Sequence, residues 1–151
     1  MHEGACAIPR GTFLAFDFGT RRVGVAVGNS VSGTAQPLTT LQENQATRRM
    51  EAIRALVYEW QPVALIVGLP AHEDGTPHAL AGACRRFARQ LKEKFNLPTL
   101  MVDERYTSTA ASAQLDAAGI RGIRQKPLLD QVAAQQILQA YLDEPAMGMC
   151  A

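Results

Sequence analysis

The sequence has few cysteines, almost no net charge and no long apolar run. Its three cysteines, Cys6, Cys84 and Cys150, are odd in number and far apart. This spacing is typical of neither a disulfide framework nor a Cys-x-x-Cys site, so it favours a reducing compartment. Fifteen basic and fourteen acidic side chains leave a formal charge of +1. No overall field would therefore hold the protein on a polyanion, and any nucleic-acid site must be a local patch.

No apolar run approaches the roughly 18 residues of a membrane span, and the N-terminus lacks the basic and apolar regions of a signal peptide. We therefore expect a cytoplasmic protein with no membrane partner. The chain has 151 residues, of which 47% are hydrophobic and 19% charged, a composition typical of one folded domain. Aperiodic ends predict tails at residues 1–11 and 144–151 around a single domain at residues 12–143.

The hydrophobic pattern predicts a mixed α/β sheet. Apolar segments 13–18 and 23–28 flank a tight polar stretch, which indicates a β-hairpin. A third strand at 34–41 belongs at an edge, because Pro37 cannot donate to a ladder. Continuous apolar runs indicate two further strands, at 63–67 and 99–102, and helical periodicity indicates helices at 45–61, 78–95, about 107–118 and 128–143. The fold class is therefore α/β, with five strands, antiparallel at first and then in β-α-β units, and helices on both faces.

Acidic residues stand at three places in this pattern. Asp17 lies within an apolar strand, Asp103 and Glu104 follow another strand, and Asp130 shares the apolar stripe of the last helix. Each has an ordinary explanation: a turn cap, loop polarity, or a first-turn carboxylate stabilised by the helix dipole. Together they could converge, because sites in open α/β sheets lie beyond the carboxyl ends of strands. Adjacent acids on a strand point to opposite sides, so only one of the pair need face the site.

Converging carboxylates repel one another and call for cations, and oxygen ligands suit Mg²⁺ or Mn²⁺. Two such ions roughly 4 Å apart can activate a water and stabilise the leaving oxygen of a phosphodiester. The acids therefore predict a metal-dependent nuclease with a two-metal site. No Ser-His-Asp or Cys-His arrangement competes, and His2, His72 and His78 are expected at the surface.

Two further groups of residues could assist. The loop containing Gly68, Pro70, Asp74, Gly75 and Thr76 could offer helix N–H groups to a phosphate, although a simple turn with a helix cap explains it equally well. Basic side chains could neutralise a phosphate backbone or remain solvated; they are Arg21, Arg22, Arg105, Arg121, Arg124 and Lys126.

Five motifs, in order, resemble the YqgF family, also called RuvX. They are Asp17-Phe18-Gly19-Thr20, Val23 to Gly28, Ile66 to Pro70 with Asp74-Gly75-Thr76, Asp103-Glu104-Arg105, and Asp130 with Ala133-Ala134 and Ile137-Leu138. The resemblance runs from about Phe13 to Tyr141 and implies a ribonuclease H-like fold, of the branch related to Holliday junction resolvases. It also implies catalytic and metal-binding roles for Asp17, Glu104 and Asp130, with Gly19 and Thr20 in a supporting turn.

Several functions stay open. Members of the family are described as nucleases that mature the 5′ end of the small-subunit ribosomal RNA precursor or resolve junctions, so structured RNA, ribosome precursors and branched DNA are the expected partners. We place RNA processing slightly ahead of junction resolution. Asp-x-Gly-Thr after a first strand also resembles the phosphate corner of actin-like and sugar-kinase ATPases, but 151 residues hold only one of their two lobes. A non-catalytic ribosome-associated or nucleotide-binding module is a further alternative. The sequence does not choose between a monomer and a homodimer.

Overall fold

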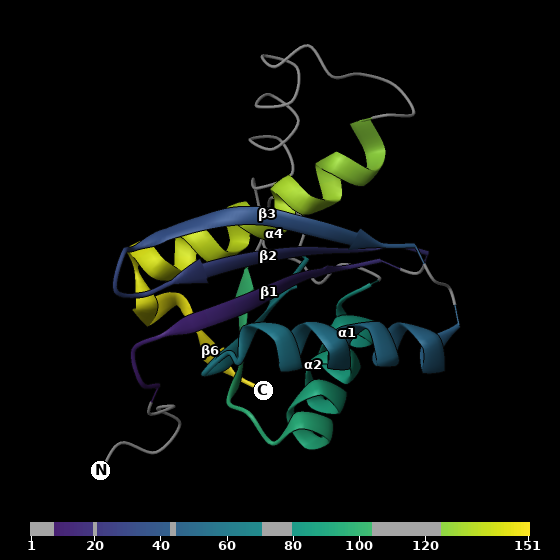
Figure 1. Cartoon of the computed structure of the whole chain (residues 1–151), viewed down its shortest axis with the longest axis horizontal. Coiled ribbons are helices and arrows are strands. Elements are labelled where there is room, and N and C mark those ends of the chain that lie inside the picture. Colours follow the sequence, from purple (N-terminus) through teal and green to yellow (C-terminus); the bar gives the residue numbers. More distant parts are fainter. Residues whose placement is uncertain (1–7, 20, 43–44, 71–79, 104–124) are drawn as a thin grey trace.

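A six-stranded mixed sheet forms the centre of the protein (Figure 1). The computed structural model describes residues 8–19, 21–42, 45–70, 80–103 and 125–151. The strand order is β3-β2-β1-β4-β5-β6. The strands are β1 (Thr12–Phe18), β2 (Val23–Asn29), β3 (Thr34–Leu41), β4 (Ala64–Leu69), β5 (Thr99–Asp103) and β6 (Met149–Cys150). β1, β2 and β3 are antiparallel, β4 and β5 run parallel to β1, and β6 is antiparallel to β5.

The C-terminal residues correct two sequence-based expectations. The sheet has six strands and not five, because β6 pairs with Leu100 and Met101 of β5. A strand of two residues is too short to show an alternating pattern, so it left no periodic signal in the sequence.

Cys150 is also disulfide-bonded, whereas Cys84 is a buried free thiol. The cysteine spacing indicated no disulfide framework, so the disulfide at Cys150 departs from that expectation. Disulfide formation depends on proximity in space, which sequence spacing does not report.

One face of the sheet packs against α4 (Gln125–Asp143), as Figure 1 shows. Phe13 of β1 lies in the core cluster under this helix, with Ile137 and Leu138. The Phe13 ring centroid is 5.5 Å from that of Tyr141. α4 begins three residues before the predicted start at 128, because a proline in the first turn of a helix loses no hydrogen bond and Pro127 stands there.

The opposite face packs against α1 (Ala46–Trp60) and α2 (Ala81–Phe95) (Figure 1). Leu14 and Phe16 alternate with the residues that face α4 and join a second core cluster with Ile53 and Phe87. Both helices end at a left-handed residue shortly before a proline. The predicted helices are therefore confirmed where the structure describes them; residues 78–79 and the helix expected at 107–118 lie outside the described ranges.

β3 is an edge strand, as Pro37 predicted. The ladder with β2 shifts register at this point, so that Val25 pairs with Thr39 and Ala26 with Pro37, which marks a β-bulge. Helix α4 also covers this strand: the Ala35 N–H donates to Gln139 Oε1 at 3.0 Å. Side-chain bonds and a bulge both discourage an edge strand from pairing with another chain. No helix in the described part of the chain combines the length and the hydropathy needed to cross a membrane.

Candidate active site

Asp17 stands at the carboxyl end of β1, on the face that packs against α4. Phe13 and Ala15 lie on that face in the core, and Asp17 follows two residues later with a half-buried side chain. Its partner across the ladder is Gly24 of β2. A carboxylate at this depth resists desolvation and is stabilised by polar or cationic neighbours. Its position is the one that the apolar strand pattern predicted.

Asp130 reaches the same end of the sheet from the other end of the chain. It lies in the second turn of α4, over Gly24: a Cβ added to that glycine would overlap the Asp130 backbone and lie 2.8 Å from the Asp130 Cβ. Only glycine leaves room for the helix to come this close. Helix-dipole stabilisation falls off within the first turn, so it does not account for an acid at this position.

Asp17 and Asp130 line one pocket of about 350 Å³. The other lining residues come from the end of β1, the segment between β1 and β2, and the residue before α2; they are Phe18, Gly19, Arg21, Arg22 and Leu80. Two carboxylates and two guanidinium groups thus share one concave surface. Carboxylates can hold metal ions and guanidinium groups can bind phosphate oxygens, so this pocket combines the two chemistries that a nuclease needs.

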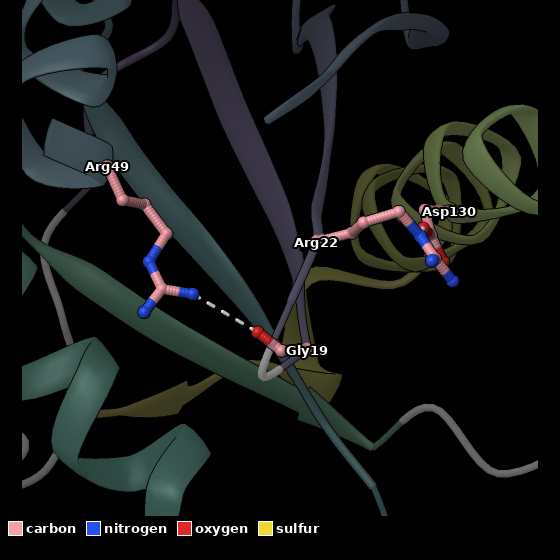
Figure 2. A network of polar contacts seen from close by, with 4 residues as sticks. All are labelled: Gly19, Arg22, Arg49 and Asp130. Carbon is pink, nitrogen blue, oxygen red and sulfur yellow. Dashed lines mark hydrogen bonds and ion pairs between the residues drawn. The ribbon is translucent and has the colours of Figure 1, made fainter. Parts of the chain in front are cut away.

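Arg22 forms an ion pair with Asp130 inside this pocket (Figure 2). Its Nε donates to Asp130 Oδ2 at 2.6 Å, and the two side chains are 35% and 21% exposed. Arg22, which its sequence position made a phosphate-binding candidate, has a carboxylate partner in the structure. A guanidinium group is a permanent cation, so it supplies positive charge to Asp130. Arg21, its neighbour in the chain, is exposed at the same pocket.

Arg49 supports the turn that follows Asp17, and sequence reasoning missed it. Its Nη1 donates to the Gly19 carbonyl oxygen at 3.2 Å (Figure 2). Its Cζ lies 5.2 Å from the centroid of the Phe18 ring. One side chain of α1 therefore contacts both residues that come directly after Asp17. Helical periodicity places Arg49 on the polar face of its helix, and nothing in that pattern indicates a contact with a turn 30 residues earlier.

Asp103, the last residue of β5, lies on the face of the sheet opposite to Asp17. Val102 belongs to the core cluster under α4, whereas Met101 belongs to the cluster under α1 and α2. Alternation along the strand places Asp103 on the face of Met101, opposite to the face of Asp17. Asp103 is therefore not the acid that joins Asp17. Glu104 lies outside the described residues, and its role as the third acid stays a prediction.

The other candidates lie either at the end of β4 or outside the described residues. Gly68 and Pro70 are described, and both are buried at the end of β4. The following lie outside the described ranges: Thr20, Asp74, Gly75, Thr76, Arg105, Arg121, Arg124, the side chain of Lys126 and all three histidines. Within those ranges, no three His, Cys, Asp or Glu side chains are grouped so that they could hold a metal ion. The proposed metal site therefore depends on Glu104 joining the two aspartates.

Family and sequence comparisons cover nearly the whole chain. The family model described as "RuvX: Holliday junction resolvase" matches residues 11–144. A protein of Nitrosospira multiformis named "Putative pre-16S rRNA nuclease" is 53% identical over 134 residues, which cover 89% of each chain. A protein of Chromobacterium violaceum with the same name is 51% identical over 137 residues, covering 90% of this chain and 100% of the relative.

Solved structures show the same fold at low sequence identity. Thermus thermophilus RuvC, in complex with a Holliday junction substrate, superposes with a TM-score of 0.56 at 15% identity, covering 93% of this chain and 99% of that one. A second structure of T. thermophilus RuvC gives a TM-score of 0.53 at 14% identity. These similarities confirm the predicted ribonuclease H-like fold.

Proposed function

The chain belongs to the RuvX family, and from this premise we propose that it is a metal-dependent nuclease that processes the 5′ end of pre-16S ribosomal RNA. The observation that carries the proposal is the shared pocket of Asp17 and Asp130. These acids come from opposite ends of the chain and meet at one concave surface. RNA is the first choice of substrate because the relatives at about 50% identity carry the pre-16S rRNA nuclease name.

The residues present fit a divalent cation. The Asp130 carboxylate already binds a cationic group, Arg22, so its environment tolerates positive charge at contact distance. Carboxylate oxygens are the ligands that Mg²⁺ and Mn²⁺ prefer. Asp17 and Asp130 would hold the metal together with Glu104. When bound, divalent ions would activate a water and neutralise charge that develops on the leaving oxygen.

The chain's own residues supply the remaining functions. Arg21 is exposed at the pocket and can bind a non-bridging phosphate oxygen of the RNA backbone. Arg22 neutralises Asp130 and orients its carboxylate through the Nε hydrogen bond. Arg49 holds the Gly19 carbonyl and stacks on Phe18, which fixes the backbone directly after Asp17. The antiparallel ladder between β1 and β2 holds the ends of these strands in register beneath the pocket.

A cleavage assay tests the proposal. Wild-type protein with Mg²⁺ or Mn²⁺ should cut a precursor RNA carrying the 5′ end of 16S rRNA, and Asp17→Asn, Glu104→Gln and Asp130→Asn should each lose activity. Outer-shell substitutions at metal sites typically cost about 10- to 100-fold, so loss of a direct ligand should exceed about a hundredfold. Asp103→Asn is the matched control, because Asp103 lies on the opposite face of the sheet and should leave cleavage intact.

Each other outcome points to a different class of protein. Unchanged activity in Asp17→Asn would overturn the catalytic assignment. Stabilisation by ATP, without cleavage, would favour a nucleotide-binding module. Association with ribosomal particles, without cleavage or a nucleotide effect, would favour a non-catalytic module.

Resolution of branched DNA is the second candidate. The family description names Holliday junction resolvases, and the RuvC fold neighbour was solved with such a junction. A four-way junction should therefore be offered beside the precursor RNA. Symmetrical cleavage of a junction would favour a two-fold dimer, so the mass of the protein in solution is measured in the same experiment. Preferential junction cleavage would replace the RNA substrate and leave the catalytic residues as proposed.

A further inference from the structure

We infer that the outer face of α2 is a docking surface for the nucleic-acid backbone that leaves the active-site pocket. Three exposed arginines, Arg85, Arg86 and Arg89, form what we name the α2 arginine stripe. Residues three and four positions apart share one side of a helix, so the three guanidinium groups project from the same face. Within the described part of the chain, none of them has an ion-pair partner.

Among the described helices that cover the two faces of the sheet, α2 carries more positive charge than α4. α2 carries five basic residues and one acidic residue, whereas α4, on the other side of the sheet, carries one basic and two acidic residues. The formal charge of +1 for the whole chain therefore conceals a local basic surface. Such a surface is the electrostatic footprint of a protein that binds a phosphate backbone.

Folding of α2 does not account for the stripe. The buried face of the helix is made by other residues, among them Phe87 and Leu91. Lys92 and Lys94, in the last turn, complement the helix dipole, but the three arginines stand before that turn and gain nothing from it. Arg85 and Arg89 are four residues apart, and like charges at this spacing weaken a helix. Helix stability therefore does not explain this like-charge pair, which indicates a role in binding.

The stripe begins close to the pocket. Leu80, the residue before α2, lines the pocket together with Asp17 and Arg22. At a rise of 1.5 Å per residue, Arg89 lies about 14 Å farther along the helix axis. Successive phosphates of one strand are spaced by about 3.4 Å along a duplex, so a strand with one phosphate in the pocket would reach the end of the stripe within about four nucleotides.

The ligand of the stripe is therefore the phosphodiester backbone of structured RNA. This inference rests on the proposed function. Backbone contacts of this kind position a substrate and carry no sequence information. The stripe would hold the RNA segment next to the scissile phosphate whatever its base sequence.

Fluorescence anisotropy with a labelled RNA hairpin that carries a single-stranded 5′ tail tests the inference, with EDTA present so that no cleavage occurs. Arg85→Gln/Arg89→Gln should bind about tenfold more weakly than wild type. Its slope of log affinity against log salt should be smaller by about 1.4–1.8, the value for two lost phosphate contacts. Arg10→Gln/Arg54→Gln removes the same number of charges at exposed positions outside the stripe and should bind within about twofold of wild type.

Thermal unfolding shows that the stripe variant is folded: its midpoint should equal or exceed that of wild type, because a like-charge pair is removed. Wild-type affinity and salt slope in the stripe variant would overturn the inference, and so would an equal loss in the control. The two proposals fail separately. RNA that binds through the stripe but is not cut counts against the nuclease alone, whereas cleavage with no binding loss in the stripe variant counts against the docking surface alone.

Discussion

Arg22 and Asp130 meet across the candidate active-site pocket, where the Nε of the arginine lies 2.6 Å from Oδ2 of the carboxylate. Arg22 directly precedes β2, Asp130 lies in the second turn of α4, and the two residues are 108 positions apart in the sequence. This ion pair joins the hairpin that carries Asp17 to the helix that covers it. It also places a cationic side chain on an acid that is proposed to hold a metal, so the guanidinium and the metal would compete for the same carboxylate.

Arg22→Ala should therefore bind Mn²⁺ more tightly than wild type. Partly exposed ion pairs are worth up to about 1 kcal/mol, which corresponds to about a fivefold gain in affinity. Isothermal titration with Mn²⁺, without substrate, measures the change. Arg21→Ala is the matched control, because it removes the same charge from the same pocket without breaking an ion pair to Asp130. Weaker Mn²⁺ binding in Arg22→Ala would show that the arginine supports the metal site and does not compete with the ion.

Gly24→Ala should destabilise the protein, because the added methyl group overlaps the Asp130 backbone. Overpacking of this kind costs about 1–3 kcal/mol, and the cost appears in the free energy of unfolding measured with urea. Gly82→Ala makes the same chemical change in the exposed N-terminal part of α2, where the nearest atom is Arg86 Nη1 at 3.5 Å. It should stabilise the protein by about 0.5–1 kcal/mol. A Gly24→Ala variant as stable as wild type would contradict the close approach of α4.

Arg49→Ala should lower cleavage without abolishing RNA binding. The variant loses the hydrogen bond to Gly19 and the contact with the Phe18 ring, so the backbone after Asp17 is held less firmly. We expect kcat to fall about tenfold, with KM little changed.

Arg54→Ala is the control for this prediction. Arg54 lies on the same helix and stacks over Phe95, with its Cζ 5.5 Å from the ring centroid. Each variant should lose about 0.5–1 kcal/mol of stability from its cation–π contact, but only Arg49→Ala should change kcat. Equal kcat values for the two variants would show that Arg49 acts on stability alone.

Tyr141 should make the stability of the protein pH-dependent in the alkaline range. Burial raises the pKa of its phenol, so the folded state keeps the proton to higher pH than the unfolded state. The phenol of the unfolded chain ionises at about pH 10. The contribution of Tyr141 to stability is therefore complete below that pH and is lost as the pH rises through the pKa of the phenol in the folded state. Urea unfolding over roughly pH 9 to 11 should show falling stability. Tyr141→Phe should reduce that fall, whereas Tyr58→Phe, at an 80% exposed position, should not.

Much of the architecture was predictable from local pattern. Alternation in β1 distinguishes two faces, and the continuous apolar run of β4 predicts a strand covered on both sides. Pro37 correctly indicated an edge strand. Such features are local because burial of one face sets the period of the hydrophobic residues within each element. β6 was not predictable in this way, since it is too short to have a period and exists because β5 offers it an open edge.

The candidate site shows the same division. Asp17 and Asp130 stood out because each is an acid among apolar residues, a local anomaly that needs no coordinates. Their common pocket, the close approach at Gly24 and the contact of Arg49 with Gly19 join segments that are distant in the chain.

By itself, the sequence determined the strands and helices, the sidedness of the sheet and the identity of the unusual acids. These follow from side-chain hydrophobicity and from repeats of two and 3.6 residues, which act over a few neighbouring positions. The tertiary structure alone decided which charges meet, that Asp103 faces away from Asp17, and that Arg22 forms an ion pair with Asp130. Those relationships depend on how helices pack on the sheet, where one hydrogen in place of a methyl group decides how closely two distant segments approach.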